Sequence, residues 1–339
     1  MHIYHADVNE AQADPLLATL LAPGPGVTPF DRLGWLQQMA RECLAPARCF
    51  IAVARDGDAI AALPLCETDR GLTALANWYS FVARPRFAHG GERLLPALLR
   101  NLSPAGALHY APLPRREAAL MLHAAQSAGW IGELSPHHVN HVLLPAGRDF
   151  ATWWATRPGR LRETVRRKRA RLTIRIARDF DADDWAAYQA IYAKSWKPAE
   201  GSPAFLRRFA ETEGAAGRLR LGLATIGNRP VAAQLWTIEG HTAFIHKLAH
   251  DPDAAAHSPG TVLTHALFAM AFDEDRVDLI DFGNGDDHYK RDWMELSEVH
   301  QRLEAYHPRA VRHWPALGKL LAKRALRLAR RARAVRTAR

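Results

Sequence analysis

The sequence has few cysteines, and this scarcity excludes several kinds of site. It contains three in 339 residues, Cys43, Cys49 and Cys66, and their spacing matches no metal-binding motif. An odd and sparse set is typical of a protein kept in a reducing compartment, where buried thiols behave as small apolar side chains. We therefore expect three buried thiols in a cytoplasmic protein.

Long apolar runs are also missing. No stretch approaches the roughly 20 residues that a membrane-spanning helix needs. The first residues, Met1–Asp7, do not place a basic region before an apolar one, so we expect no secretory signal. Both observations agree with a cytoplasmic location.

Acidic residues are absent from the last segment of the chain. Residues 309–339 contain eleven Lys and Arg and no Asp or Glu, while the whole chain has a net charge of +10, which leaves −1 on residues 1–308. A basic segment with this pattern predicts an amphipathic helix on an anionic membrane surface, at the inner face of the plasma membrane. On one helical side lie Leu317, Leu320, Leu321, Leu328 and Ala332, flanked by Lys319, Lys323, Arg327, Arg330 and Arg331.

Two parts of the chain look like copies of each other. The pattern Phe-Asp-x3-Trp at 30–35 recurs at 180–185, and each copy is expected to open a helix behind an Asp cap. Residues 54–65 and 224–235 both predict strand, tight turn and strand. The separations of 150 and 170 residues indicate a duplicated domain, unless the similarity is accidental.

The second half has a mixed α/β pattern of helices, an antiparallel meander, a helix and further strands. Between the halves, residues 160–172 predict a basic helix that either connects the domains in solvent or faces a phosphate group. We expect helices at 184–194, 202–211 and 262–272, and strands at 219–226, 231–238, 242–249, 277–282 and 299–306.

The second half resembles the GNAT acetyltransferase superfamily, in the branch that includes FemAB-type and CelD-type proteins. The resemblance lies in Gly217–Gly222 with Pro230–Gln234, in Ser258–Thr261, and in Asp281–Gly283 with Gly285–Lys290. It implies an α/β fold of two tandem GNAT-like domains, with mixed, largely antiparallel sheets flanked by helices. The basic C-terminal helical tail lies outside the resemblance and completes the expected fold.

The resemblance divides the chain into a GNAT-like domain at 1–150, a catalytic GNAT domain at 151–308 and the tail at 309–339. We expect the first domain to be non-catalytic, because it has no equivalent of Ser258–Gly260 or of Asp281–Lys290.

The expected cofactor is acyl-CoA, used as a co-substrate. Its pyrophosphate needs several donors, which the start of a helix provides at Ser258, Gly260 and Thr261, although the same motif can be a plain helix cap. Lys290 is expected to bind cofactor phosphate, or else to lie in solvent. We expect no metal, because the histidines at 137, 138 and 141 have no nearby fourth ligand.

Amide formation from a thioester requires a base for the amine and a proton for the leaving thiolate. His246 shares a strand face with Phe244, and is either this base or a core histidine. Asp281 ends an apolar strand and is either catalytic or a structural carboxylate. The resemblance implies that Tyr289 protonates the thiolate, although it can equally be structural.

We therefore expect transfer of an acyl group from acyl-CoA to a primary amine. The basic tail favours a membrane lipid amine as acceptor, such as a sphingoid long-chain base in ceramide synthesis, and bacterial ceramide synthases resemble this branch. The loop at 196–202 can cover the acceptor. An amino sugar in polysaccharide assembly is the alternative acceptor, and a FemAB-like aminoacyl-tRNA the alternative donor. Nucleic acid is not expected, because no aromatic residues interleave with the basic runs.

Overall fold

The computed structural model describes the backbone of residues 1–337, and the side chains of that range except those at 328 and 330–337. The chain forms two compact units, and each combines segments that are far apart in the sequence. Unit 1 contains Met1–Ala22, Met39–His137 and the chain from Val299 onward, and unit 2 contains Pro23–Gln38 and His138–Glu298. The two units do not follow the domain boundaries predicted after residues 150 and 308. Those boundaries remain a proposal.

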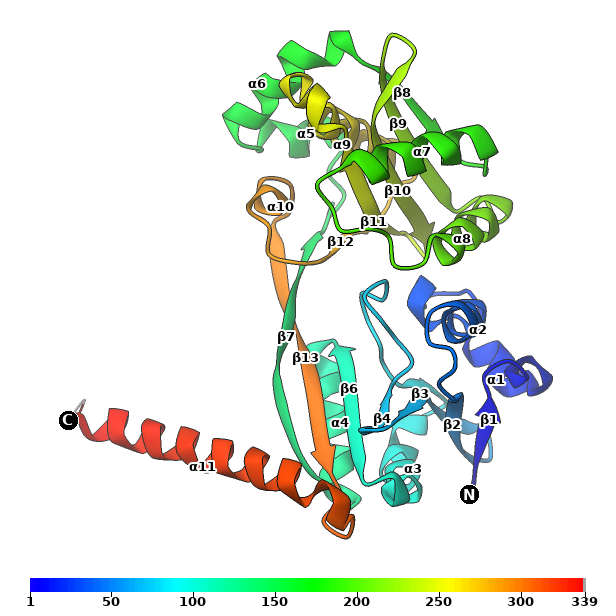
Figure 1. Cartoon of the computed structure of the whole chain (residues 1–339), viewed down its shortest axis with the longest axis vertical. Coiled ribbons are helices and arrows are strands. Elements are labelled where there is room, and N and C mark those ends of the chain that lie inside the picture. Colours follow the sequence, from blue (N-terminus) through cyan, green and yellow to red (C-terminus); the bar gives the residue numbers. More distant parts are fainter. Residues whose placement is uncertain (338–339) are drawn as a thin grey trace. The chain divides into compact units, whose positions relative to one another are not determined.

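The sheet of unit 1 is mostly antiparallel, with one parallel pair, β4–β6 (Figure 1). The strand nearest the C-terminus, β13, lies between β6 and β7, and both β7 and β13 continue into unit 2. The spatial order is β1 (His2–Asp7), β2 (Cys49–Asp56), β3 (Ala59–Thr68), β4 (Gly71–Ala74), β6 (Ala107–Leu113), β13 (Leu296–Tyr306) and β7 (Ile131–Leu143), and β5 (Arg86–Ala88) pairs with β3.

The core of unit 1 forms where α3 (Leu95–Asn101) and α4 (Arg115–Ser127) place their apolar sides against strand residues. Leu98 and Met121 from the helices join Leu63 and Leu108 from the strands, all fully buried. α1 (Pro15–Leu20) begins behind Asp14, whose carboxylate accepts hydrogen bonds from two free N–H groups of the first turn.

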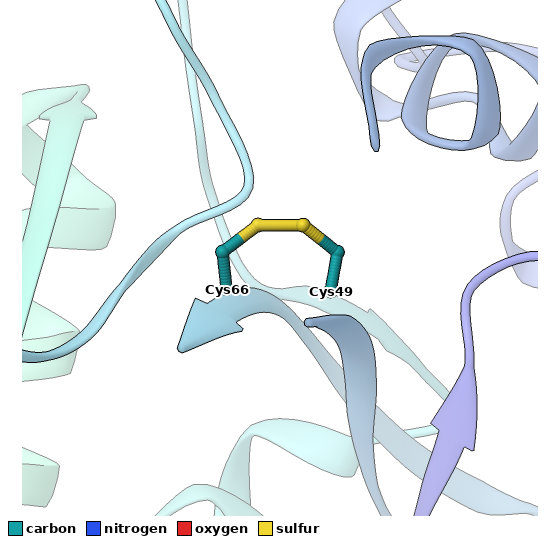
Figure 2. The surroundings of a disulfide bond; sticks show 2 residues. All are labelled: Cys49 and Cys66. Atoms are coloured by element: carbon teal, nitrogen blue, oxygen red, sulfur yellow. A yellow bond between two sulfur atoms is a disulfide. The ribbon is translucent and has the colours of Figure 1, made fainter. Parts of the chain in front are cut away.

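The cysteines of unit 1 correct one expectation. Cys49 and Cys66 lie directly opposite each other in the antiparallel pair β2–β3 and form a disulfide, with their Cα atoms 4.1 Å apart (Figure 2). The expectation of three thiols was therefore wrong for this pair, and Cys43 is not part of the bond. The register of two strands decides such a pairing, and register is a tertiary property that cysteine spacing does not reveal.

The sheet of unit 2 confirms the predicted meander, with strand ends within two residues of those expected. The neighbours from β12 to β8 are antiparallel except β11–β12, which is parallel. Gly240 and His241 both have positive φ, at 51° and 63°, as a two-residue hairpin turn requires. The order is β7, β12 (Leu279–Asn284), β11 (Thr242–His250), β10 (Arg229–Glu239), β9 (Leu219–Ile226) and β8 (Thr173–Ala177).

Helices flank this sheet, as the predicted α/β class requires. α7 contacts β9, β10 and β11, and α9 contacts β8 through β11 as well as α6. Trp153, Trp236 and Phe268 are fully buried in the core that these elements form. The helices are α5 (Phe150–Ala155), α6 (Gly159–Lys168), α7 (Ala182–Lys194), α8 (Pro203–Ala215), α9 (Pro259–Ala269) and α10 (His288–Trp293).

Residues 23–38 belong to unit 2, although they precede most of unit 1. Within them, Trp35 on α2 (Leu33–Glu42) packs edge-on against Phe205 and Phe209, with ring centroids 4.9 and 5.0 Å away. The expected Asp cap is found at Asp181 before α7, but Asp31 instead closes a capping box with Thr28 in the turn before α2. The two copies of the pattern therefore have different local structures.

The tail forms α11 (Trp314–Thr337), as expected, but its first turns are not free to meet a membrane. Leu317 and Leu320 are buried in unit 1 against Ala107 and Tyr306, while Leu321 is 43% exposed. Four residues of the predicted helical face, Leu328, Arg330, Arg331 and Ala332, lie outside the described side chains. Among residues 1–337, no helix is both long and apolar enough to cross a membrane.

Candidate functional site

The candidate site begins where β11 and β12 stop pairing. Their parallel register covers residues 242–244 of β11 and 279–281 of β12, yet β11 continues to His250 and β12 to Asn284. On its other side, the register of β11 against β10 shifts at His246, which forms a bulge. Strand ends that stop pairing present backbone polar groups, and open α/β sheets place their ligands at such points.

Asp281 lies at the end of this pairing and is 7% exposed. Its Oδ1 accepts a hydrogen bond from the N–H of Gly283 at 2.8 Å. Burial raises the pKa of Asp281 to about 6, although hydrogen bonds from Gly283 and Asn140 and the charge of Lys290 act in the opposite direction. A carboxyl group with this pKa can exchange a proton near neutral pH, as a general base must.

Lys290 lies on α10 and is 4% exposed. Its ammonium group donates to the carbonyl oxygens of Phe282, Gly283 and Asn284, at 3.2, 3.3 and 2.6 Å. These bonds use the three donors of an ammonium group, and burial lowers the pKa of Lys290 to about 8. The geometry favours a role in holding the loop after β12 over the predicted role at the cofactor phosphate.

Tyr289 precedes Lys290 and is 39% exposed. Its ring packs edge-on against Phe282, with the centroids 5.7 Å apart. Burial, with a smaller effect from the charge of Asp287, raises the pKa of Tyr289 above its usual value. The phenol therefore keeps its proton at physiological pH and is able to donate it.

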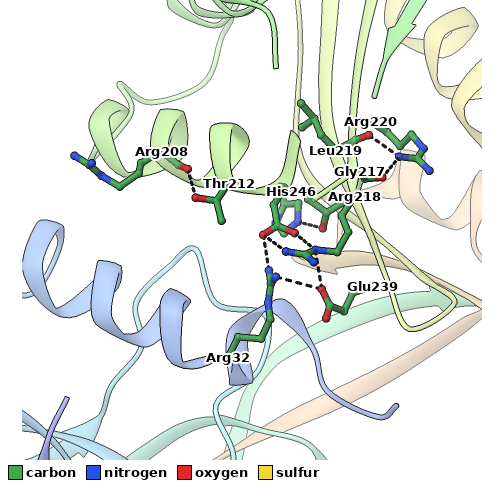
Figure 3. Close-up of polar contacts among 11 residues, drawn as sticks. Arg32, Arg208, Thr212, Gly217, Arg218, Leu219, Arg220, Glu239 and His246 are labelled. Atoms are coloured by element: carbon green, nitrogen blue, oxygen red, sulfur yellow. Dashed lines mark hydrogen bonds and ion pairs between the residues drawn. The ribbon is translucent and has the colours of Figure 1, made fainter. Parts of the chain in front are cut away.

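His246 lies in unit 2, near the guanidinium group of Arg32 (Figure 3). Its Nε2 lies 2.8 Å from Oγ1 of Thr237, and its ring packs edge-on against Phe30 and Phe209. Burial, then the charge of Arg32, lowers the pKa of His246 to about 3. The imidazole is therefore neutral at physiological pH and a weak base, which favours the core-histidine alternative.

The start of α9 lies beside the end of β11. A Cβ at Gly260 would lie 3.5 Å from Nδ1 of His250. Ser258 is the N-cap residue of α9, with φ +49°, and its side chain makes no capping hydrogen bond. The N–H groups of Gly260 and Thr261 lie in the first turn, where a helix offers them no acceptor.

The predicted basic helix is α6, followed by a short turn at Arg169–Arg171, and α6 packs against α9. Its apolar residues Leu161 and Val165 are buried, while Arg162 is exposed. Burial, followed by the charge of Arg169, lowers the pKa of His265 on α9 to about 4, which places that guanidinium near the helix. The basic helix α6 therefore lies next to α9.

A cavity of about 480 Å³ lies among α7, α8 and the loop that follows α7. Aromatic and apolar side chains, including Trp185, Tyr188 and Leu206, form most of its lining. Lys197 and Glu200 contribute the charged groups. This loop is the segment that we expected to cover an acceptor.

Sequence reasoning missed the polar contacts at this cavity. Nζ of Lys247 on β11 lies 2.9 Å from Oε2 of Glu200, and the ammonium group lies over the ring of Tyr192 at 5.4 Å. Burial, then the charge of Glu200, raises the pKa of Tyr192 to about 12. Burial, then Lys247, lowers the pKa of Lys197, while Asp287 before α10 raises it. Strand alternation gave no signal for these contacts, because the bulge at His246 interrupts it directly before Lys247.

Comparison with known families gives a match for the segment that carries this site. Residues 159–291 match the family described as Acetyltransferase (GNAT) domain. This segment is similar to a GNAT domain. The match contains α9, the parting of β11 and β12, Asp281, Tyr289 and Lys290, and GNAT-type transfer of an acyl or aminoacyl group is the chemistry that it supports. A search of the curated proteins finds no match to the sequence.

Solved structures extend the similarity beyond the GNAT domain to most of the chain. FemX matches with a TM-score of 0.62 and 10% identity, over 90% of this chain and 97% of its own. The C-terminal domain of a candidate lysylphosphatidylglycerol synthetase from Agrobacterium fabrum matches with a TM-score of 0.55 and 11% identity, over 88% and 91%. A tandem GNAT protein from the clavulanic acid biosynthesis pathway matches with a TM-score of 0.51 and 14% identity, over 90% and 98%. The fold is that of the GNAT and FemAB-like branch.

Proposed function

We propose that the chain transfers an acyl group from acyl-CoA to a primary amine, with Asp281 as general base. The observation that carries this proposal is the buried carboxyl of Asp281, with a pKa of about 6, where β11 and β12 stop pairing. An amine must lose a proton to become a nucleophile, and a base with a pKa near the working pH serves best. His246, with a pKa of about 3, suits this task less well.

In the proposed reaction, the amine nitrogen attacks the thioester carbonyl carbon and its proton passes to Asp281. The carbon–sulfur bond then breaks, and Tyr289 gives a proton to the departing thiolate. Lys290 holds the loop between these two groups through its carbonyl contacts. The N–H groups of Gly260 and Thr261, aided by the dipole of α9, would bind the pyrophosphate, with Ser258 beside them.

For the acceptor we propose an amine with a long alkyl chain, such as a sphingoid base. The mostly apolar cavity between α7 and α8 suits such a chain. The exposed Leu321 and Leu326 and the basic residues of α11 support attachment to an anionic membrane. We place the reaction at the cytoplasmic face, where acyl-CoA is supplied. The scarcity of cysteines no longer supports that location, because Cys49 and Cys66 form a disulfide.

An aminoacyl donor is the second candidate. FemAB-like proteins use aminoacyl-tRNA, and FemX and the candidate lysylphosphatidylglycerol synthetase share this fold. An amino sugar remains the alternative acceptor. Purified chain should be incubated separately with short acyl-CoA, long acyl-CoA and aminoacyl-tRNA, against a sphingoid base in vesicles, a soluble amine and an amino sugar. Product mass identifies both substrates, and products formed from aminoacyl-tRNA alone would reject the CoA proposal.

Replacing Gly260 with Asp is expected to weaken CoA binding at least tenfold, which equals about 1.4 kcal/mol. The new carboxylate would repel the pyrophosphate at the first turn of α9. Gly260→Ala is the matched control, because a Cβ there makes only ordinary contact with His250 at 3.5 Å. Calorimetry with CoA measures both variants. Equal affinity of Gly260→Asp and the unaltered chain for CoA would show that the pyrophosphate does not bind at this helix.

A further inference from the structure

Unit 1 contains a cavity of about 700 Å³ at the beginning of α11, and the proposed reaction gives it no role. Three arginines from separate parts of the chain line it. Arg70 comes from the turn between β3 and β4, Arg302 from β13, and Arg312 from the short turn before α11. A cavity built by three distant segments is a product of the tertiary fold.

The three guanidinium groups lack acidic partners. Over residues 1–337, none of the ion pairs of 4.0 Å or less that the described side chains form includes Arg70, Arg302 or Arg312. Nη2 of Arg302 lies 3.0 Å from Nδ1 of His137, and Arg312 donates to the carbonyl of Ala105 at 2.6 Å. Two of the guanidinium groups are thus held by a histidine nitrogen and a carbonyl oxygen, and not by a carboxylate.

Other arginines of unit 1 behave differently. Arg48 pairs with Glu67 and Arg93 pairs with Asp56, both at 2.8 Å. The cavity is not short of carboxylates, because Asp69 and Glu304 also line it. Three cations and two anions leave a positive charge in a concave site, and such a site concentrates anions.

Rings form another part of the lining. Tyr306 packs edge-on against His109 at 5.6 Å and lies 6.2 Å from His313, between ring centroids. The Tyr306 hydroxyl and the imidazole nitrogens add hydrogen-bonding groups beside the guanidinium groups. Convergent polar groups in a cavity of this size are typical of a site for a small ligand.

We propose that this cavity binds a phosphomonoester group. A guanidinium offers paired donors that match two phosphate oxygens, and three of them suit the doubly charged monoester better than a singly charged diester. The group can belong to a small soluble metabolite or to a lipid headgroup, because both present the same oxygens. The proposal does not depend on the transferase reaction, which we place in unit 2.

The test uses the full chain and the double variant Arg70→Gln with Arg302→Gln. The matched control is Arg48→Gln with Arg93→Gln, which removes the same charge from the same unit. Calorimetry with glycerol 3-phosphate measures the soluble source. Co-sedimentation with phosphatidylcholine vesicles containing phosphatidic acid, or phosphatidylglycerol at equal charge, measures the lipid source. The basic tail is present throughout, so its contribution is constant.

We expect the cavity variant to weaken binding of the monoester at least about tenfold, and the control variant to leave it within about twofold. Loss with glycerol 3-phosphate identifies a soluble ligand, and loss confined to phosphatidic acid vesicles identifies a lipid headgroup. The proposal is overturned if the unaltered chain binds neither monoester. It is equally overturned if both variants bind alike, or if phosphatidylglycerol binding falls as much as phosphatidic acid binding.

Discussion

Replacing Asp281 with Asn is expected to lower turnover by about 10²-fold or more while the chain remains folded. Asn keeps the shape of the side chain and accepts the hydrogen bond from Gly283, but it cannot take a proton from the amine. Steady-state rates with saturating acyl-CoA and amine measure the effect. Asp278→Asn, an exposed change just before β12, is the matched control and should keep its full rate.

The pH dependence separates a catalytic from a structural role for Asp281. Because the base acts when deprotonated, turnover of the unaltered chain should rise with pH through about 6. The residual rate of Asp281→Asn should be flat there. The acceptor must be an amine whose own pKa lies outside this range. A flat profile for the unaltered chain, or normal turnover of the variant, would remove Asp281 from the reaction.

Stability gives an independent check on the same variant. A carboxyl whose pKa is raised in the folded chain adds stability below its ordinary value of 3.8, and this contribution is lost as the pH rises through about 6. At pH 8, which lies above this window, removing the buried charge should therefore cost no stability. Chemical denaturation should give Asp281→Asn an equal or higher free energy of unfolding than the unaltered chain.

Replacing Arg32 with Met is expected to lower the free energy of unfolding by about 3 kcal/mol or more. Arg32 is 7% exposed, and its guanidinium lies 2.7 Å from Glu213 and 3.4 Å from Glu239 (Figure 3). Arg218 contacts the same two carboxylates, at 2.8 and 3.4 Å. Without Arg32, two buried carboxylates share one cation, and breaking a buried network in this way is far more costly than losing an exposed pair.

The matched control is Arg93→Met, which breaks the exposed pair with Asp56 and should change stability far less. Burial already raises the pKa of Glu239. Its protonated form should therefore relieve part of the Arg32→Met defect as the pH falls, and adding Glu239→Gln should relieve part of it at neutral pH. Equal losses from both Arg variants would show that residues 23–38 are only loosely attached to unit 2.

Local sequence patterns predicted many helices and strands of unit 2, because residues within or next to each element mark where it begins and ends. Residues 219–226 form β9 with the expected ends, and Asp181 caps α7 as predicted. Alternation, turn residues and caps depend on neighbours within a few positions. The same reasoning expected Asp281 at the end of an apolar strand, but the structure places it inside β12, which continues to Asn284, at the point where the pairing with β11 ends.

Features that depend on tertiary contacts were beyond this reasoning. Lys290 was expected to bind phosphate or to lie in solvent, yet its ammonium group contacts three carbonyl groups. The bulge at His246 and the opposition of Cys49 and Cys66 both depend on strand register. Leu317 and Leu320 have an amphipathic pattern that fits a membrane or a protein core equally well, and the structure places them in a core.

The interleaving of the two units sets the order in which a growing chain can fold. Unit 2 consists of residues 23–38 and a segment that ends at Glu298. It therefore cannot be complete until the ribosome has made the chain as far as Glu298. Unit 1 must wait longer, because β13 lies between β6 and β7 and is made only after the long segment of unit 2. Until then, the sites on β6 and β7 that β13 will fill remain unpaired strand edges, which invite association with other chains. No single cut divides the chain into two independently folding pieces, so each unit can fold only after most of the other has been synthesised.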